Sequence, residues 1–332
     1  MRATHRRAFE GVVDTMTDRP RSRLRDRLGS SLARLIRGRV AGTVPGGHDG
    51  MFARRIDAPL LATTSTLPEL PLVSVVMTCH DTLRYLDDAV ASILGQTWRH
   101  LELIVVDDAS QDGSLDRLHE LASTDDRLRI IPLTTNTGTY RAKNIGMHNA
   151  RGEVLTFMDS DDTSHHERIE RQLRLLREPG LVATTCNYVR RTGDGEVVLN
   201  RGLRERQALI SLMIKRAVVD DVGWFDSVRT SADDEFFERI RDVYGRKAHI
   251  NLDNALYVAL SREHSLSTSA GNAVDLWVND SVGTSSLSSV RQAYVAAYRE
   301  WHARTKAAGM RPYMPHTLAS GRPFPAAPLL TA

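Results

Sequence analysis

Short apolar runs alternate with amphipathic stretches between residues 72 and 158. The runs are rich in β-branched residues, which predicts strands buried on both faces. In the stretches between them, apolar residues recur every three or four positions, which predicts helices with one buried face. We expect strands over 72–78, 101–106, 128–133 and 154–158, and helices over 83–95, 114–122 and 143–150. Strands that alternate with helices predict an α/β fold with a mainly parallel central sheet and flanking helices.

The pattern becomes less regular after residue 165. It predicts helices over 165–177, 205–216 and 233–244, a strand over 182–189, and one or two helices within 273–308. Residues 41–71 are rich in Gly, Pro, Thr and Ala and predict a linker or a loosely packed lead-in. Five prolines between 312 and 328 predict an extended tail. We therefore expect an arm and linker over 1–70, a main domain over 71–270 with halves 71–162 and 163–270, and a helical extension with a proline-rich tail over 271–332.

Residues 19–39 form a strongly basic segment with eight arginines and one acid, Asp26. Leucines recur within it at helical spacing, so it predicts a basic amphipathic helix in a helical N-terminal arm. Such a helix suits an anionic membrane surface. A solvated helix packed on the protein body and a disordered basic arm are the alternatives. The net charge of this segment is +7, whereas that of the whole chain is +3, so the rest of the chain carries about −4.

The composition of the 332 residues, 41% apolar and 26% charged, is that of a globular protein. It excludes a wholly disordered chain, a collagen-like repeat and a multi-span membrane protein. Two cysteines, Cys79 and Cys186, are too few for a disulfide framework and indicate a reducing, cytoplasmic setting. No apolar run approaches the length of a transmembrane helix, and the N-terminus lacks the apolar region of a secretory signal.

Three of the expected strands end in polar, mostly acidic residues. These are Thr78 to Asp81, Asp107 to Gly113 and Asp159 to Asp162. The carboxyl ends of parallel strands meet at one edge of a sheet, where ligands bind in this class of fold. Carboxylates gathered there predict a hard divalent metal, Mg²⁺ or Mn²⁺, shared with a diphosphate. The alternative is that single acids cap the helices that follow.

The loop 136–146 contains glycine, enters a helix, and carries Arg141 and Lys143. Helix N-terminal amides and a nearby cation favour contact with a phosphate or a nucleobase. We expect only one of these two cations to face the ligand. The glycine signatures of dinucleotide-binding turns and of P-loops are absent from the sequence.

Taken in order, these motifs resemble those of the family 2 glycosyltransferases, which use nucleotide sugars and have the GT-A fold. The resemblance covers about 72–245 and includes 92–97, 102–110, 136–146, 159–162, 222–226 and 233–239. The GT-A fold is a Rossmann-like α/β architecture. The resemblance makes 71–162 the nucleotide-binding half and 163–270 the acceptor-side half.

The resemblance also implies roles for individual residues. Asp159-Ser160-Asp161 matches the D-x-D motif, in which Asp159 contacts the ribose or the metal and Asp161 holds the metal. Asp233, or its neighbour Asp234, matches the general base, and Arg239 matches a structural cation that pairs with a carboxylate. His264 is either a further metal ligand or a surface histidine. The residues expected to contact the nucleotide are Thr78, Asp81, Asp107, Asp108, Arg141, Lys143 and Asp159.

The activity implied is transfer of a sugar from a nucleotide-sugar donor to a hydroxyl of a saccharide or lipid-linked acceptor. It implies a single displacement with inversion, assisted by Mn²⁺ or Mg²⁺, in bacterial surface polysaccharide synthesis at the inner face of the membrane. The sequence departs from the family pattern at Cys79-His80-Asp81 and at Trp224. The alternatives are a nucleotide-sugar-binding protein without turnover and a D-x-D phosphatase of the haloacid-dehalogenase type. No nucleic-acid partner is expected, because the chain outside 19–39 is acidic.

Overall fold

The computed structural model describes residues 51–199, 202–261, 289–318 and 321–331. The predicted basic helix at 19–39 and the candidate ligand His264 lie outside these residues. The chain divides into two units, 1–48 and 49–332, and the described residues all lie in the second. Within the described residues, no helix has both the length and the apolar character needed to cross a bilayer.

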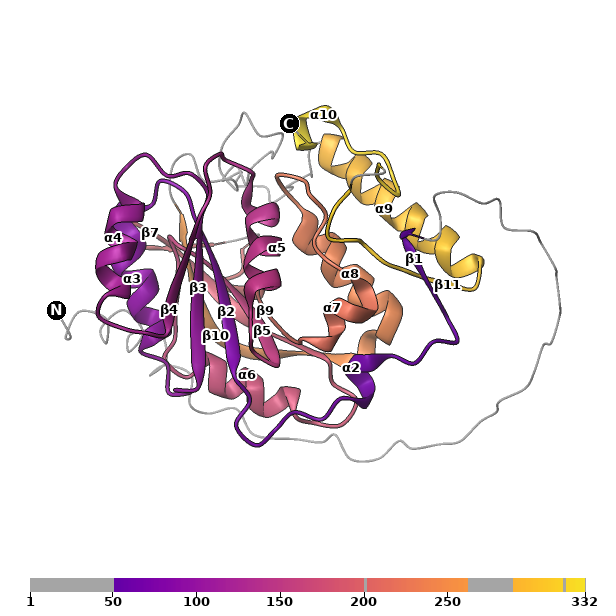
Figure 1. Cartoon of the computed structure of the whole chain (residues 1–332), viewed down its shortest axis with the longest axis horizontal. Helices are drawn as coiled ribbons and strands as arrows, with labels where there is room; N and C mark the ends of the chain where they lie inside the picture. Colours follow the sequence, from indigo (N-terminus) through magenta and orange to yellow (C-terminus); the bar gives the residue numbers. More distant parts are fainter. Residues whose placement is uncertain (1–50, 200–201, 262–288, 319–320, 332) are drawn as a thin grey trace. The chain divides into compact units, whose positions relative to one another are not determined.

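The first half of the main domain follows the predicted strand–helix alternation (Figure 1). The four strands are β2 (Val73–Cys79), β3 (Leu101–Asp107), β4 (Leu128–Pro132) and β5 (Val154–Asp159). The helices between them are α3 (Leu83–Leu94), α4 (Ser114–Ala122) and α5 (Thr139–Asn149). Helix α5 begins four residues before its predicted start, directly after Gly138. The strand and helix predictions for this half are confirmed.

The second half adds β6 (Thr163–Ser164), α6 (Arg168–Leu176), β7 (Ala183–Thr192), β8 (Val197–Val198), β9 (Glu205–Lys215), α7 (Ala217–Val222), α8 (Ala232–Tyr244) and β10 (His249–Ser261). The helix predicted over 205–216 is wrong, because this segment is the strand β9. It contains good helix formers such as Leu, Met and Lys, but it pairs with β5 on one side and β7 on the other. Pairing on both sides outweighs local helix propensity. The sequence pattern did not predict β10.

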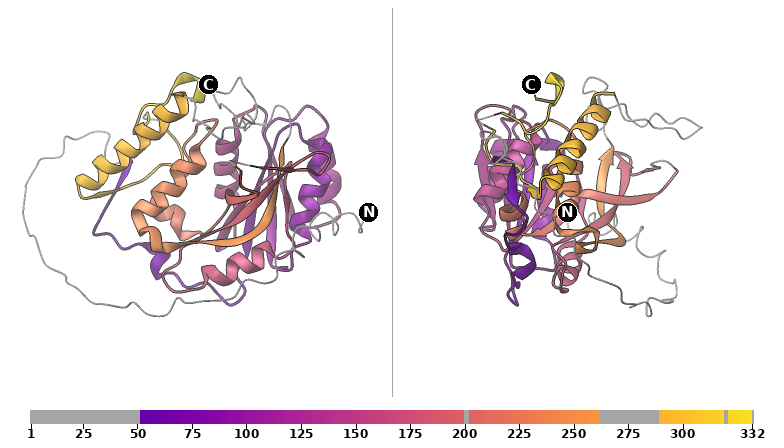
Figure 2. Two further views of the ribbon diagram at one scale, coloured as in Figure 1. Left: turned by 180° about the vertical axis from the view of Figure 1, so that it is seen from behind. Right: turned by 90° about the vertical axis from the view of Figure 1, so that its right-hand side faces the viewer.

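Among the described residues the main sheet has nine strands, in the order β4-β3-β2-β5-β9-β7-β10-β6, with β8 paired to β7. The first four strands are parallel, whereas β9 is antiparallel to both of its neighbours. In the side view of Figure 2 the later strands (salmon to orange) extend away from the first four, so the sheet is curled. The sheet is therefore parallel where the acidic strand ends lie and mixed beyond them.

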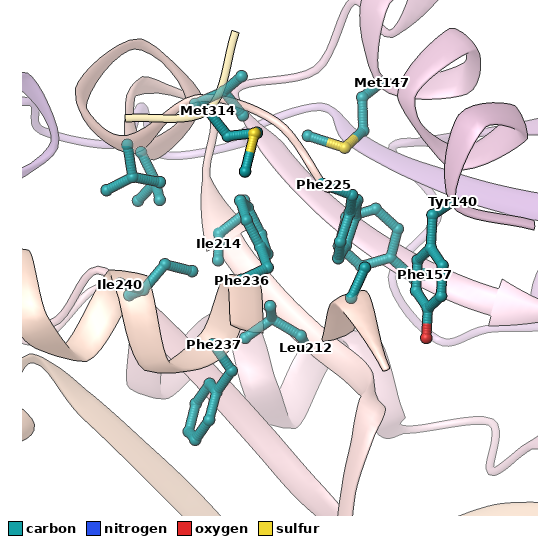
Figure 3. Packing of buried hydrophobic residues seen from close by; sticks show 14 of the residues in the cluster. Tyr140, Met147, Phe157, Leu212, Ile214, Phe225, Phe236, Phe237, Ile240 and Met314 are labelled. Carbon is teal, nitrogen blue, oxygen red and sulfur yellow. The ribbon is translucent and has the colours of Figure 1, made fainter. Parts of the chain in front are cut away.

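Helices cover both faces of the sheet, and the strand residues alternate between two apolar clusters. Val75 and Met77 of β2 pack with α3, α4 and α6. Val76, between them, packs on the opposite face with α5, α7 and α8. Figure 3 shows the second cluster, in which Phe225 lies against Phe157 at 5.2 Å between ring centroids. This cluster fixes α5 and α8 beside one another.

The segments at the two ends of the described unit pack onto its body. Strand β1 (Ala53–Arg55) pairs with β11 (Met310–Pro312), and Phe52 and Met314 are buried. The short helix α2 (Leu61–Thr64) is held by Asp221, whose carboxylate accepts from its first two amides. Helices α9 (Ser289–Ala307) and α10 (Pro328–Thr331) complete the C-terminal part. The prediction of an extended tail is wrong, because the prolines interrupt the segment without preventing Phe324 from packing in the core.

Candidate functional site

A cavity of about 1420 Å³ lies at the carboxyl ends of the parallel strands. Its walls come from β2, β5, the start of α5, β7, β9, β10, α8 and α9. Of the predicted site residues, it brings together Thr78, Asp81, Asp108, Lys143, Asp159, Asp161, Asp233 and Asp234. Residues that lie far apart in the sequence thus share one volume, large enough for a nucleotide sugar and part of a second ligand.

The strand ends meet as the sequence predicts. Thr78 lies opposite Asp159 in the ladder between β2 and β5, and Cys79 lies opposite Asp107 in the ladder between β2 and β3. Lys143 from α5 reaches this edge and places its Nζ 3.1 Å from Asp159 Oδ1. The Lys143 side chain is 6% exposed, against 39% for Asp159. A nearly buried cation therefore supports an accessible carboxylate at the cavity floor.

The acids after β5 have different surroundings. Asp162 is buried and accepts hydrogen bonds from the Tyr257 hydroxyl, at 2.8 Å, and from the Leu260 amide. Burial first, and then the charges of Asp161 and Asp159, raise the pKa of Asp162 well above its usual value. Strand β10, missing from the sequence prediction, thus holds the turn that carries the D-x-D motif.

Asp159 and Asp161 are the described residues best suited to hold a divalent metal in this cavity. They present carboxylate oxygens, the ligands that Mg²⁺ and Mn²⁺ prefer. Both charges raise the pKa of the neighbouring Asp162, so the end of β5 is a region of concentrated negative charge. A divalent cation would offset this charge, so the residues fit the predicted metal.

The glycine-containing loop before α5 is anchored by Asp108. Its Oδ1 accepts from the Thr137 amide at 2.7 Å and its Oδ2 from the Gly138 amide at 2.8 Å. Asp108 is only 3% exposed, and its Oδ1 also accepts from the Thr137 hydroxyl at 2.9 Å. Thr139 continues the loop with its hydroxyl 3.1 Å from that of Thr78. Both oxygens of Asp108 are thus used to shape the start of α5 at the edge of the cavity.

The other predicted nucleotide-binding residues divide between the cavity and its surroundings. Asp81 lines the cavity with a left-handed backbone (φ 49°), and its Oδ1 accepts from the Gln111 amide. Asp107 is 1% exposed, accepts from the Ser110 amide, and is not a cavity residue. Arg141 is exposed and also lies outside the cavity lining, whereas Lys143 is part of it. Of these two cations only Lys143 lines the cavity, and contact of either one with the nucleotide stays a prediction.

The first turn of α8 carries the two aspartates predicted to include a general base. The Tyr140 hydroxyl donates a hydrogen bond to Asp233 Oδ1 at 2.6 Å. Asp234 Oδ2 accepts from the Arg291 guanidinium of α9 at 2.7 Å. Burial first, and then the charge on Asp233, raise the pKa of Asp234 to about 6, although Arg291 acts in the opposite direction. The two adjacent carboxylates thus bind different helices, Asp233 a residue of α5 and Asp234 a residue of α9.

Sequence reasoning missed Tyr140, Tyr257 and Arg291. Tyr140 lies within the loop motif, but its aspartate partner is 93 positions away. Arg291 belongs to a region of the chain where the sequence shows no decisive motif. The structural role predicted for Arg239 is confirmed, since it is fully buried and pairs with Glu235 on the preceding turn of α8.

A second group of metal-ligating side chains lies outside the cavity lining. His165, His166 and Glu167 have ligand atoms within 4.8 Å of one another. Burial and the neighbouring His166 lower the pKa of His165 to about 4, and His165 Nδ1 accepts from the Glu167 amide. These residues connect β6 to α6, and the Gln96 side chain donates to the His165 carbonyl. Their contacts indicate a role in the fold.

Comparisons with known proteins agree with the motifs. Residues 74–237 match the model of glycosyl transferase family 2. An uncharacterized glycosyltransferase of Haemophilus influenzae is 35% identical over 119 residues, which are 36% of this chain and 48% of the relative. TuaG of Bacillus subtilis, provisionally named a teichuronic acid biosynthesis glycosyltransferase, is 34% identical over 125 residues, 38% of this chain and 50% of the relative. The chain thus spans about half the length of these curated relatives.

Among solved structures, TarS residues 1–349 of S. aureus in complex with UDP-GlcNAc has 20% sequence identity and a TM-score of 0.49. The match covers 60% of this chain and 62% of that one. The curled mixed sheet with helices on both faces is the α/β architecture that the motifs imply, the GT-A fold. The family match over 74–237 and the two curated relatives show that this part of the chain belongs to glycosyl transferase family 2.

Proposed function

We propose that the protein transfers a sugar from a nucleotide-sugar donor to a hydroxyl group of a saccharide or lipid-linked acceptor, with inversion at the anomeric carbon. One observation carries the proposal. A single cavity is lined by the D-x-D aspartates from the end of β5 and by two aspartates from the first turn of α8. A displacement with inversion needs a leaving group and a base on opposite sides of the reacting carbon, and these two sets can supply both.

The donor would bind at the strand ends. Thr78, Asp81 and the loop that Asp108 orders line the part of the cavity suited to a nucleoside. Asp159 and Asp161 would hold Mg²⁺ or Mn²⁺, which supplies Lewis-acid stabilisation of the departing diphosphate. Lys143 adds a fixed positive charge beside Asp159, so the negative charge that develops on the leaving group meets a cation of the chain itself.

The acceptor hydroxyl would meet the first turn of α8. We assign proton removal to Asp233, because Tyr140 orients one of its oxygens by a 2.6 Å hydrogen bond. Asp234, paired with Arg291, would keep a second negative charge close by. Asp233 thus accepts its hydrogen bond from a neutral donor, whereas Asp234 accepts from a cation.

The proposed place of the reaction in the cell rests on the basic segment 19–39 and on the names of the relatives. We propose that the basic segment 19–39 holds the protein at an anionic membrane surface, at the inner face of the cell membrane, where a lipid-linked acceptor would be presented. A role in surface polysaccharide synthesis accords with the name of the Bacillus subtilis relative TuaG. Deleting 1–40 should lower binding to vesicles that contain anionic lipid and leave transfer to a water-soluble acceptor intact.

Thermal unfolding of the full chain tests the donor. The protein is heated with UDP-, GDP-, CDP- and dTDP-sugars, each with and without Mn²⁺. We expect one nucleotide class to raise the melting temperature, and to raise it further when the metal is present. A protein that no nucleotide sugar stabilises would contradict the proposal. Release of phosphate from simple phosphoesters would favour the phosphatase alternative instead.

A further inference from the structure

The cavity extends beyond the proposed donor and base residues, over a polar patch on β7, β9 and β10. This patch consists of Thr185, Asn187, Gln207, His249 and Asn251, of which Asn187, Gln207 and Asn251 line the cavity. The strands bring the residues together because β7 lies between β9 and β10, with Asn187 opposite Gln207 in one ladder. The patch is built from amides, a hydroxyl and an imidazole, so it carries no carboxylate of its own.

The Thr185 hydroxyl organises the patch. It donates to Asn251 Oδ1 at 2.8 Å and accepts from Gln207 Nε2 at 2.9 Å. The one hydroxyl proton of Thr185 is donated to Asn251. His249 Nε2, 2.9 Å from Thr185 Oγ1, must therefore be the donor in its contact with that oxygen. Burial, and then the charge of Arg241, lower the pKa of His249 to about 4, so the ring is neutral at physiological pH.

The same network leaves hydrogen-bonding atoms for a ligand. Both polar atoms of the Asn251 amide form hydrogen bonds, since its Oδ1 accepts from Thr185 and its Nδ2 donates to Asn187 Oδ1 at 2.9 Å. Asn187 Nδ2 and Gln207 Oε1 have no partner among the described residues. One fixed donor and one fixed acceptor thus line the cavity, a combination suited to sugar hydroxyl groups, which both donate and accept.

A cation lies at the edge of the patch. The Arg241 guanidinium lines the cavity and lies 5.4 Å from the centroid of the Phe237 ring, which packs perpendicular to the His249 ring at 4.7 Å between centroids. Within the described residues Arg241 forms no ion pair. On the same helix Arg239 is fully paired with Glu235, and on α9 Arg299 is paired with Glu238. Arg241 is therefore a half-buried guanidinium whose charge is not compensated by a carboxylate of the described chain.

We propose that Asn187, Gln207 and Arg241 form an acceptor subsite for a sugar residue that carries an anionic group, a carboxylate or a phosphate. The two amides select the hydroxyl pattern, and the guanidinium pairs with the anion through charge-assisted hydrogen bonds. The subsite rests on the proposed function, because it deepens the acceptor side of the same cavity. It names the chemical class of acceptor that the family assignment leaves open.

Binding of three probes to the full chain tests the subsite. The probes are methyl glucuronide, glucose 6-phosphate and the neutral methyl glucoside, titrated with and without UDP and Mn²⁺. We expect at least one charged probe to bind about tenfold more tightly than the neutral one. Preference for the glucuronide would identify a uronic acid acceptor, and preference for the phosphate would identify a phosphorylated one.

Variants separate the subsite from the rest of the cavity. Arg241→Gln should abolish the preference for the charged probe, and Arg241→Lys should restore part of it. Gln207→Glu should lower the affinity for the charged probes, because the new carboxylate repels their anionic group, and should change the affinity for the neutral probe little. Arg304→Gln, which removes an exposed arginine of α9 outside the cavity, is the matched control and should leave all three affinities unchanged.

Two outcomes would overturn the subsite. Either the neutral probe binds as well as both charged probes, or Arg241→Gln binds the charged probes as the wild type does. In both cases stabilisation by nucleotide and metal would persist if the proposed transferase function is correct. Loss of nucleotide stabilisation in the wild type would instead count against the function itself, so the two failures are distinguishable.

Discussion

The Tyr140 hydroxyl donates a 2.6 Å hydrogen bond to Asp233, and this contact links the loop helix α5 to the first turn of α8. Tyr140 is 7% exposed, and its ring packs on Phe225 at 5.6 Å between centroids. The aromatic core thus fixes the direction from which the hydroxyl reaches the carboxylate. Because α5 also carries Lys143, one helix contacts both the proposed donor side and the proposed base.

Replacing this tyrosine should impair transfer more than binding. In Tyr140→Phe the ring remains in the core, but Asp233 loses the donor that orients it. We expect the turnover number to fall about tenfold, the size expected for loss of a hydrogen bond to a charged group. The affinity for nucleotide should not change. Steady-state kinetics and thermal shift with nucleotide measure the two quantities.

Tyr244→Phe is the matched control for this variant. Tyr244 also donates to an aspartate, Asp221, but neither residue lines the cavity. Its loss should lower the free energy of unfolding by about 1 kcal/mol and leave the turnover number unchanged. Equal effects of the two substitutions on turnover would show that the contact of Tyr140 is merely structural.

The two aspartates of α8 should differ in their effect on catalysis. Asp233→Asn removes the proposed base without changing its size, and we expect transfer to fall by a factor of about 10² to 10⁴. Asp234→Asn removes a charge that is paired with Arg291, so a smaller loss is expected. Both variants should bind nucleotide as the wild type does. An active Asp233→Asn beside an inactive Asp234→Asn would move the base to Asp234.

The effect of the metal on nucleotide binding should depend on the D-x-D motif. In Asp161→Ala one of the two proposed oxygen ligands is lost, so Mn²⁺ should no longer increase the thermal stabilisation by nucleotide. The charge-matched control is Asp116→Ala, which removes an exposed aspartate from α4. If Asp161→Ala kept the metal-dependent part of the stabilisation, the metal would have to be held elsewhere.

The parts of the site that the sequence could predict are those in which ligands and elements lie close together in the chain. Asp159 and Asp161 follow a strand whose apolar run is unmistakable, and the parallel order of the first strands brings Asp107 and Asp159 to one edge. Arg291 and Tyr257 could not be found in this way. Arg291 is 57 positions from its partner Asp234, and Tyr257 is 95 positions from its partner Asp162. The strand β10, which carries Tyr257, has no clear periodicity in the sequence.

The strand β9 shows why the second half was harder to predict. Its residues include Leu212, Met213 and Ile214, which favour a helix as readily as a strand when taken alone. Met213 is fully buried because β9 is an inner strand between β5 and β7. Burial on both faces removes the alternation that marks a half-exposed strand, so only the tertiary pairing decides its structure.

The stability of the contact between α8 and α9 should depend on pH through His302. Burial would lower the pKa of His302, but hydrogen bonds to Asp242 and Glu235 outweigh it and raise the pKa above its usual 6.5. A histidine with a raised pKa contributes stability fully below the pKa of the unfolded chain and loses it as the pH rises through the folded pKa. The contribution should therefore disappear at alkaline pH.

The variant His302→Gln isolates this contribution. The difference in free energy of unfolding between wild type and variant should be on the order of 1 kcal/mol larger at pH 6 than at pH 9. Urea unfolding across this pH range provides the measurement, and a difference independent of pH would mean that folding leaves the pKa of His302 unchanged.

The C-terminal segment should be an integral part of the fold, and Gly223 tests this. Its backbone is left-handed (φ 83°), and a Cβ there would lie 1.9 Å from the Met314 carbonyl oxygen. Gly195 has a similar φ of 87° but nothing within 4 Å of the same position. Gly195→Ala should therefore cost only the backbone strain, about 1–2 kcal/mol, whereas Gly223→Ala should cost about 1–3 kcal/mol more because the chain must move apart. Urea unfolding of both variants separates the two terms, and equal losses would mean that residues around Met314 do not pack on the body.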